Sequence, residues 1–382
     1  MADLFDYLLW RGDLSFAQVP PNAVDALIFS ALSYIRFGAD VESSPDTPIL
    51  LSKAFEDLTS LPDFEDRIRV KKDLELLEAV SQSPRFSNCK IYQYRDILIR
   101  EEETQFAAIT FLLDDGSAFL AFRGTDYTLT GWKEDFNMFF RSVIPGHISA
   151  VHYLQTVAAR LPGKLYLGGH SKGGNLALYG AAFAGREIQE RIISVFNHDG
   201  PGLSNDIQRM PGYTDLCDKL HTTVPQASLF GLMFSSCGFQ VVKSDRMGIM
   251  QHDPFSWEIS GDDFIYAENL KSNANKLIFT IYDLMANLSR QDREVFIDTV
   301  FRVIAAPGVS SFTEWPVMAV KEFDSMVSTL KSIDEETAVK MKTVLAEFAK
   351  ALGKNMFNLP DKEKIKQFIV EKVNTISKKD KL

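Results

Sequence analysis

The chain has 382 residues, of which 46% are apolar and 24% are charged, a composition that is ordinary for a globular protein and excludes a disordered one. Its 41 basic and 51 acidic residues give a formal net charge of −10 at pH 7. Because phosphate binding needs a cationic face, this balance also excludes a general nucleic-acid binder.

The first 90 residues carry a mostly helical pattern. Asn22 is placed to cap a helix whose apolar residues recur at helical spacing as far as Ile35, and residues 66–80 form a second amphipathic pattern. The opening residues are acidic and lack a basic cluster, so they do not resemble a secretory signal. We therefore expect an N-terminal helical segment over residues 1–90 that packs on the core.

Strand patterns begin at about residue 91. Two apolar runs flank Asp114-Asp115-Gly116 and predict a hairpin. Further strands are predicted at residues 91–94, 96–100, 164–168, 192–197, 219–223 and 239–243, and helices over about 147–160 and 173–183. Strands separated by helices predict an α/β protein with a mostly parallel sheet and helices on its faces. This core is expected to fill residues 91–260.

Helical spacing returns from about residue 260, for example at Val295, Phe296 and Val300, and predicts a C-terminal helical region over residues 261–382. Residues 331–382 contain 12 Lys and 8 acidic residues. Amphipathic helices of this kind can contact a membrane surface, although a solvated helical face is the commoner explanation. No apolar stretch approaches the ~20 residues that a membrane span needs, so no transmembrane segment is expected.

The chain has three cysteines, Cys89, Cys217 and Cys237, and none has a metal-ligand spacing or a CxxC partner. So sparse a set argues for a reducing compartment and against a disulfide framework. We expect three inert buried thiols in a cytoplasmic protein. The sequence has no HExxH motif, P-loop or dinucleotide fingerprint, so no metal and no cofactor are expected.

A G-x-S-x-G motif, Gly169-His170-Ser171-Lys172-Gly173, lies between a short apolar strand pattern and a helix of small residues. A nucleophile elbow requires this context, because its serine occupies a tight strand-to-helix turn that presents the hydroxyl above the sheet. The N–H of Lys172, the residue after the serine, can donate to an oxyanion. The alternative is a glycine-rich turn that only joins two elements. We interpret Ser171 as a nucleophile on an α/β-hydrolase fold.

A serine nucleophile needs a base, and in this fold the base follows both the elbow and the acid along the chain. His252 lies in the loop after the last predicted strand, where it would reach over the serine, and we predict that it is the base. A histidine of a surface loop is the alternative. His198 and His221 also lie downstream of the serine, and His221 falls in a predicted buried strand. His147 and His152 precede the serine, and His170 is expected to pack within the elbow.

The acid of such a site fixes the imidazole tautomer and stabilises the imidazolium. Asp199 ends the strand that follows the elbow helix, so its carboxylate would leave the sheet at the edge where ligands of α/β sheets bind. We predict Asp199 as the acid. Asp245 and Asp253 are the alternatives, and Asp199 could instead only shape the Gly-Pro-Gly turn that follows it.

A second oxyanion donor should come from the loop after an earlier strand. Thr125 follows the apolar run FLAFRG and offers both an N–H and a hydroxyl. The aromatic stretch after it could form an acyl pocket, a lid or ordinary core, and comprises Trp132, Phe136, Met138, Phe139 and Phe140.

Two of these motifs resemble the class 3 (fungal-type) lipases. AFRGTDYTLTGWKEDF is similar to their oxyanion-loop motif, F-R-G-[ST] followed by W-x-x-D, and GGHSKGGNLA is similar to their elbow, G-H-S-L-G-G-A-L-A. This likeness covers about residues 105–260. The whole chain also resembles an uncharacterised bacterial family of lipase-like α/β-hydrolases, with FNHDGPGL, VPQASLFG and GIMQHDPFSW as further marks.

The resemblance implies roles position by position. Ser171 matches the lipase nucleophile, Thr125 the oxyanion Ser/Thr, Lys172 the second amide donor, and His252 the base by its order. The acid departs from the pattern, because class 3 lipases carry it after the next strand, where this chain reads HTTVPQAS without an Asp. Asp199 instead resembles the placement in pancreatic-type lipases. Lys172 is also larger and more polar than the lipase residue, and its cation would favour an anionic substrate.

We therefore expect a serine hydrolase of the lipase or esterase type that cleaves a small-molecule or lipid ester, or a thioester, through an acyl-enzyme on Ser171. The carboxylic-ester class is implied by the resemblance, whereas the residues themselves indicate acyl-transfer machinery. The displaced acid motivates the alternative, a catalytically inactive protein of the α/β-hydrolase fold that binds a lipid or a protein partner.

Overall fold

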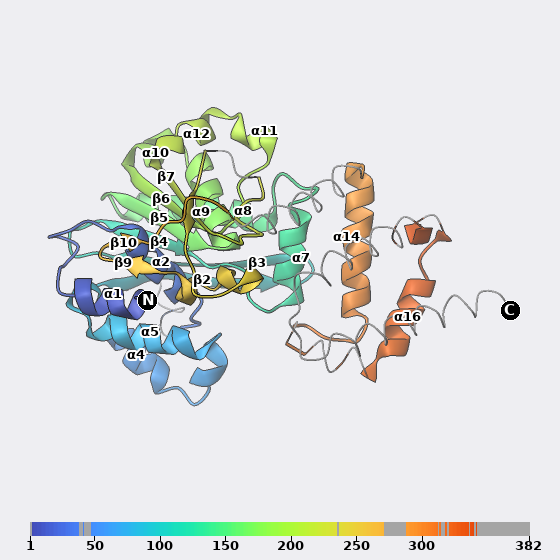
Figure 1. Ribbon diagram of the computed structural model, residues 1–382, viewed down its shortest axis with the longest axis horizontal. Coiled ribbons are helices and arrows are strands. Elements are labelled where there is room, and N and C mark those ends of the chain that lie inside the picture. Colours follow the sequence, from blue (N-terminus) through green and yellow to red (C-terminus); the bar gives the residue numbers. More distant parts are fainter. Residues whose placement is uncertain are drawn as a thin grey trace.

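The computed structural model describes residues 2–37, 41, 47–234, 237–270, 288–311, 313–314, 318, 321–335, 337–339 and 341. Within these residues, eight strands form one sheet, and their order across the sheet is their order along the chain. Figure 1 shows the sheet between its helices. They are β1 (Ile49–Leu50), β2 (Lys90–Ile99), β3 (Thr104–Leu112), β4 (Ala118–Phe122), β5 (Leu165–His170), β6 (Ile192–His198), β7 (Leu220–Pro225) and β8 (Gln240–Val242). Neighbours from β1 to β4 are antiparallel, and neighbours from β4 to β8 are parallel. The predicted α/β class with a mostly parallel sheet is confirmed.

Strand β4 shows why the middle of the sheet reads as a continuous apolar run. Phe119 and Ala121 belong to a core cluster that they share with the N-terminal helices, whereas Leu120 and Phe122 belong to a cluster on the opposite face. Successive side chains of a strand point to opposite faces, so a strand covered on both sides needs an apolar residue at every position. The sheet is therefore buried between two layers of helices.

The hairpin predicted around Gly116 is confirmed, with Gly116 at a φ of 81° between β3 and β4. The two strands predicted before it are in fact one strand, β2, whose pairing with β3 shifts register between Tyr92 and Arg95. Gln93 has a φ of 52° in this irregularity. A bulge interrupts the alternation of side chains along a strand, which is why the sequence pattern divides β2 in two.

Helices of the N-terminal segment cover one face of the sheet (Figure 1). They are α1 (Leu4–Arg11), α2 (Ala23–Leu32), α4 (Leu51–Thr59), α5 (Lys71–Gln82) and α6 (Pro84–Ser87), with a 3-10 turn η1 (Phe64–Arg67) before α5. Asn22 caps α2 as predicted, since its side chain accepts from the N–H groups of Val24 and Asp25. The Arg85 guanidinium pairs with the Asp25 carboxylate at 2.6 Å, and both side chains are fully buried. A buried ion pair between α6 and α2 thus holds the helices of this layer together, in addition to apolar packing.

The opposite face carries α8 (Pro145–Arg160) and α9 (Lys172–Phe183), which confirm the helices predicted there. Three short helices continue this layer in Figure 1: α10 (Arg186–Arg191), α11 (Asn205–Gln208) and α12 (Pro211–Thr214). Together with the sheet and the elbow between β5 and α9, these layers form an α/β-hydrolase fold.

At one end of the molecule, α7 (Leu129–Asn137) packs against α14 (Arg290–Ala305), with α16 (Phe323–Lys331) beyond it (Figure 1). The rings of Phe136 on α7 and Phe301 on α14 have centroids 5.6 Å apart. Lys133 on α7 pairs with Asp298 on α14 at 3.0 Å. The contact between the two helices therefore combines an apolar centre with a polar rim.

The expectation of helix from residue 260 onward is wrong for its first residues. β9 (Ile259–Ser260) and β10 (Asp263–Phe264) form a small hairpin that turns at Gly261, whose φ is 63°. Strands of two residues are too short to show any periodicity, so the sequence could not reveal them. The part of the predicted C-terminal helical region beyond residue 341 lies outside the described residues, and the division of the chain at residues 90 and 260 stays a prediction. None of the described helices has the length and apolar character that crossing a bilayer requires.

The expectation of three separate thiols is also wrong. Cys217 and Cys237 form a disulfide, with Cα atoms 5.7 Å apart, while Cys89 is a buried free thiol. The two bonded cysteines stand on either side of β7 and the loop after it. Only the folded path of that loop brings them together, and their spacing of 20 residues carries no signal of its own.

Candidate active site

Ser171 is the single residue between the end of β5 and the start of α9, and it has a φ of 59° and a ψ of −135°. This is a conformation that residues with a side chain rarely adopt, and such strain concentrates at functional sites. The glycines of the motif allow the turn to close: a Cβ on Gly169 would lie 2.2 Å from the carbonyl carbon of Gly173, and one on Gly173 would lie 2.0 Å from the Phe122 oxygen. The G-x-S-x-G motif therefore forms the tight strand-to-helix turn that its sequence context predicts, and Ser171 as a nucleophile stays a prediction.

The register of the parallel strands brings the predicted acid beside the elbow. His170 at the end of β5 and His198 at the end of β6 are paired, so Ser171 and Asp199 each follow one member of the pair. The Ser171 N–H donates to the His198 carbonyl oxygen at 2.9 Å. Asp199 itself has a φ of 53° and is fully buried.

The structure brings Asp199 and His252 into contact. The Nδ1 of His252 lies 2.6 Å from Oδ2 of Asp199. The other carboxylate oxygen accepts from the Ser228 hydroxyl and, at 3.2 Å, from the Gly231 N–H. The loop after β7 thus holds the carboxylate, while His252 keeps 24% of its side chain exposed. Sequence reasoning did not identify Ser228 and Gly231 as site residues, although both lie in the VPQASLFG segment.

The alternative acids point elsewhere. Asp253 accepts from the Phe255 N–H at 3.1 Å and pairs with Arg246 at 3.5 Å, which turns it away from the neighbouring imidazole. Asp245 is exposed, and its N–H donates to the Ser256 carbonyl oxygen. Among the carboxylates of the described residues, the structure shows a hydrogen bond to the His252 ring for Asp199.

His147, His152 and His221 lie in surroundings that differ from that of His252. His147 is buried on α8 with its Nε2 2.7 Å from the Asn175 side-chain oxygen, and His152 is exposed on the same helix. His221 stacks on the Phe196 ring at 5.0 Å, but its side chain is exposed rather than buried, which corrects the expectation for it. The second residue of β7 is exposed to solvent, and the sequence of the strand does not indicate this.

His170 does more than pack. Its Nε2 lies 2.7 Å from the main-chain oxygen of His252, and because a carbonyl only accepts, Nε2 carries the proton. Its Nδ1 then accepts from the Tyr34 hydroxyl, 3.1 Å away. Burial lowers the pKa of His170 well below its usual range, so this imidazole is neutral. Tyr34, held under the guanidinium of Arg69 at 3.8 Å, brings the N-terminal segment into the site. Sequence reasoning did not find Tyr34.

Of the two candidate oxyanion residues, Lys172 belongs to the elbow and Thr125 lies in a segment beside it. Gly124 passes so close that a Cβ on it would lie 3.1 Å from the Cβ of Ser171, which places the Thr125 segment beside the serine. The Thr125 hydroxyl donates to Asp135, the Asp of the W-x-x-D segment, at 2.5 Å. Burial raises the pKa of Asp135 to about 6.

The side chain of Lys172 turns inward. Its ammonium pairs with the Glu134 carboxylate at 2.8 Å, and both side chains are fully buried. The expectation that this cation would favour an anionic substrate is therefore wrong, because its charge is already matched inside the protein. The partner, Glu134, lies 38 positions earlier in the chain, so the sequence around the elbow gives no sign of the pairing.

The Mbeg1-like family model matches residues 80–302, more than half of the chain. The chain belongs to the Mbeg1-like family. Comparison with curated proteins finds no match. Similar solved structures include a triacylglycerol lipase with a serine protease triad as its catalytic centre (18% identity, TM-score 0.34, covering 57% of this chain and 76% of that one). Others are the native propeptide complex of Rhizomucor miehei lipase (15% identity, TM-score 0.34, 70% and 88%) and lipase II from Rhizopus niveus (17% identity, TM-score 0.30, 50% and 76%).

In this Mbeg1-like chain most of the predicted aromatic stretch packs with α14. Phe136, Phe139 and Phe140 lie in a cluster that contains Phe296, Ile297 and Phe301, and Trp132 packs against the same cluster. Trp132 also contacts Phe230, with ring centroids 6.3 Å apart, and Phe230 lies 4.8 Å from the His252 ring. An aromatic wall of Trp132 and Phe230 therefore stands beside the candidate base.

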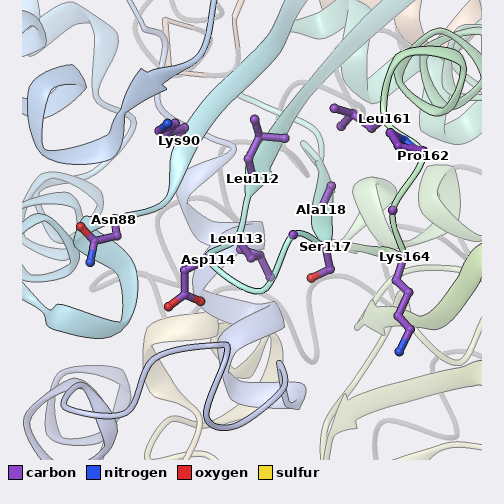
Figure 2. Close-up of a pocket in the computed structure, with 12 residues that line it drawn as sticks. Asn88, Lys90, Leu112, Leu113, Asp114, Ser117, Ala118, Leu161, Pro162 and Lys164 are labelled. Atoms are coloured by element: carbon purple, nitrogen blue, oxygen red, sulfur yellow. The ribbon is translucent and has the colours of Figure 1, made fainter.

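A pocket of the Mbeg1-like chain lies at the opposite edge of the sheet (Figure 2). Lys164, which lines it, comes directly before β5, whereas Ser171 comes directly after that strand. The turn between β3 and β4 forms another side of it, including Asp114 and Ser117. This pocket is thus separate from the elbow. Over the described residues, no cluster of His, Cys, Asp and Glu has the arrangement of a metal site.

Proposed function

We propose that this chain is a serine hydrolase of the lipase or esterase type, which cleaves a carboxylic ester or thioester through an acyl-enzyme on Ser171. The observation that carries the proposal is the contact of Asp199 with Nδ1 of His252, beside a serine in the strained elbow conformation. An Nδ1–H that donates to a carboxylate leaves Nε2 of the same ring free to accept a proton.

The reaction would proceed in two steps, acylation of Ser171 and hydrolysis of the acyl-enzyme. Nε2 of His252 takes the proton of the Ser171 hydroxyl while Oγ forms a bond to the carbonyl carbon, and the resulting oxyanion accepts from the N–H groups of Thr125 and Lys172. The C–O or C–S bond then breaks, and the leaving group takes the proton from His252. Water attacks the acyl-enzyme in the same way, with His252 again as base, and releases the acid and Ser171.

The surroundings of His252 support an apolar acyl group. Phe230 and Trp132 form the aromatic wall on one side of the imidazole. A lipid ester or a small ester with an apolar acyl chain would place that chain against this wall, where burying apolar surface is favourable by about 25 cal/mol per Å². The displaced acid, which motivated a non-catalytic binding protein, gives little support to that alternative, since the carboxylate of Asp199 contacts His252.

The test is covalent labelling of the folded protein with a fluorophosphonate, together with hydrolysis of p-nitrophenyl esters of increasing chain length. We expect labelling and hydrolysis by the wild type and neither by Ser171→Ala. Ser81→Ala, on helix α5 of the N-terminal layer, is the matched control and should behave as the wild type. Retained hydrolysis in Ser171→Ala, or a folded wild type that takes no label, would overturn the proposal.

A further inference from the structure

The ammonium of Lys172 is fully engaged inside the protein. Its three N–H donors match three acceptors: Oε2 of Glu134 at 2.8 Å, Oε1 of Gln105 at 2.7 Å and the main-chain oxygen of Gln105 at 2.9 Å. Lys172 is also the first residue of α9 and directly follows Ser171. The side chain thus ties the first turn of the elbow helix to strand β3.

Glu134 is the centre of this arrangement. Besides Lys172, its carboxylate accepts from the Gln105 N–H at 3.1 Å and from the Gly146 N–H at 2.8 Å, and its side chain is fully buried. One carboxylate on α7 therefore joins β3, the start of α8 and the start of α9. Every bond is made to the carboxylate, and charge-assisted hydrogen bonds are in general stronger than bonds between neutral groups.

The next residue of α7 holds the other side of the elbow. Asp135 accepts from the Thr125 hydroxyl at 2.5 Å and lies 3.9 Å from the Lys172 ammonium. Adjacent carboxylates on a single helix thus hold both segments whose N–H groups would meet an oxyanion. A buried ion pair is by itself weak evidence for stability, because apolar residues of similar volume often replace it without loss.

We propose that the buried Lys172–Glu134 pair, completed by Gln105, is a positioning device: it holds the main-chain N–H of Lys172 where it and the N–H of Thr125 can donate to the same oxyanion. This inference rests on the proposed function. Oxyanion donors act only within a narrow range of distances from the developing charge, so a small displacement of the first turn of α9 lowers the rate without weakening substrate binding. Glu134 and Gln105 are positioning residues here and touch no substrate.

Lys172→Met tests the device, because methionine keeps most of the length of lysine and removes the charge. We expect kcat on a soluble short-chain ester to fall about 10- to 100-fold, with KM within about twofold, since the loss concerns the transition state alone. The rate of fluorophosphonate labelling should fall in parallel, because phosphonylation develops charge on an oxygen in the same position.

A second variant keeps the test decisive if Lys172→Met leaves Glu134 as an uncompensated buried charge and the protein unfolds. In Lys172→Met/Glu134→Gln both charges are removed, so we expect its melting temperature to lie above that of the single variant while kcat stays low. A folded single or double variant with the kcat of the wild type would overturn the inference.

Arg85→Met provides the matched control, because it breaks another fully buried ion pair, Arg85 with Asp25, in the N-terminal layer. We expect a lower melting temperature with an unchanged kcat per folded molecule. If Arg85→Met lowered kcat as much as Lys172→Met, the loss would reflect a weakened fold, and the inference would fail. An inactive wild type in the same assay would instead contradict the proposed function.

Discussion

The imidazole of His170 donates from Nε2 to the main-chain oxygen of His252, 2.7 Å away, and the two rings lie 4.5 Å apart. The residue before the proposed nucleophile therefore holds the backbone of the proposed base. Since the Tyr34 hydroxyl supplies the proton that His170 Nδ1 accepts, the N-terminal segment takes part in placing that base.

Tyr34→Phe removes this hydroxyl and leaves Nδ1 of buried His170 without its donor. A neutral hydrogen bond contributes about 1 kcal/mol, so we expect kcat/KM to fall about fivefold. The rate of fluorophosphonate labelling should fall in parallel, because labelling of Ser171 needs the same base. A purely structural tyrosine would leave the labelling rate of the folded protein unchanged.

The control is Tyr153→Phe, which also removes a buried hydroxyl, in this case one bonded to Thr110 at 2.7 Å. Tyr153 packs on the α8 side of the sheet, away from the elbow. It should lose stability and keep its kcat/KM and its labelling rate. An unchanged kcat/KM and labelling rate in folded Tyr34→Phe would show that His170 does not need Tyr34.

Asp199→Asn tests the acid. An amide in this position can donate to Nδ1 and so select the wrong imidazole tautomer, and the corresponding change in serine proteases lowers kcat by about 10⁴-fold. We expect a loss of 10³- to 10⁴-fold, on the order of what that change produces. Asp253→Asn, beside the same histidine but paired with Arg246, should retain most of the activity. Equal activity of the two variants would remove Asp199 from the proposed triad.

The features that sequence reasoning found are those encoded within a few neighbouring residues. The elbow at Ser171 is a local pattern of glycines between a strand and a helix, and Asp199 follows directly from the end of a strand. The helix cap at Asn22 is equally local. Such features need no knowledge of how distant segments meet.

The features that were missed depend on distant segments. Tyr34 reaches His170 across 136 residues, and Gln105 reaches Lys172 across 67. A long cationic side chain reads the same in sequence whether it enters solvent or pairs in the core, so the orientation of Lys172 was misjudged. The Cys217–Cys237 bond was missed for the same reason.

Phe230→Ala tests the aromatic wall. Phe230 lies between Trp132 and the His252 ring, so its removal takes apolar surface from the region where we place the acyl chain. Burial of such a side chain contributes roughly 1.5–3 kcal/mol, and we expect KM to rise about tenfold for a long-chain ester and much less for an acetate ester. Phe239→Ala, at an exposed phenylalanine just before β8, serves as the control. A uniform change across chain lengths would mean that the acyl chain lies elsewhere.

His198→Phe concerns stability alone. His198 is fully buried between aromatic rings that include Phe196, Trp257 and Phe264, and within the described residues neither ring nitrogen has a hydrogen-bond partner. Burial lowers its pKa from 6.5 to about 3. The unfolded chain therefore binds a proton below pH 6.5 that the folded protein does not bind until about pH 3, so this residue destabilises the fold increasingly as the pH falls through that window. At pH 5 the effect amounts to about 2 kcal/mol.

Phenylalanine has a similar shape and does not titrate. We expect His198→Phe to raise the melting temperature at both pH 8 and pH 5, because two unpaired polar atoms leave the core, and to raise it more at pH 5. The measurement is thermal unfolding of both proteins across pH 4–8, with His152→Phe, at an exposed position on α8, as the control that should show no such gain on acidification. A gain that is equal at pH 5 and pH 8 would mean that His198 is protonated in the folded protein, and hence that a partner stabilises its charge.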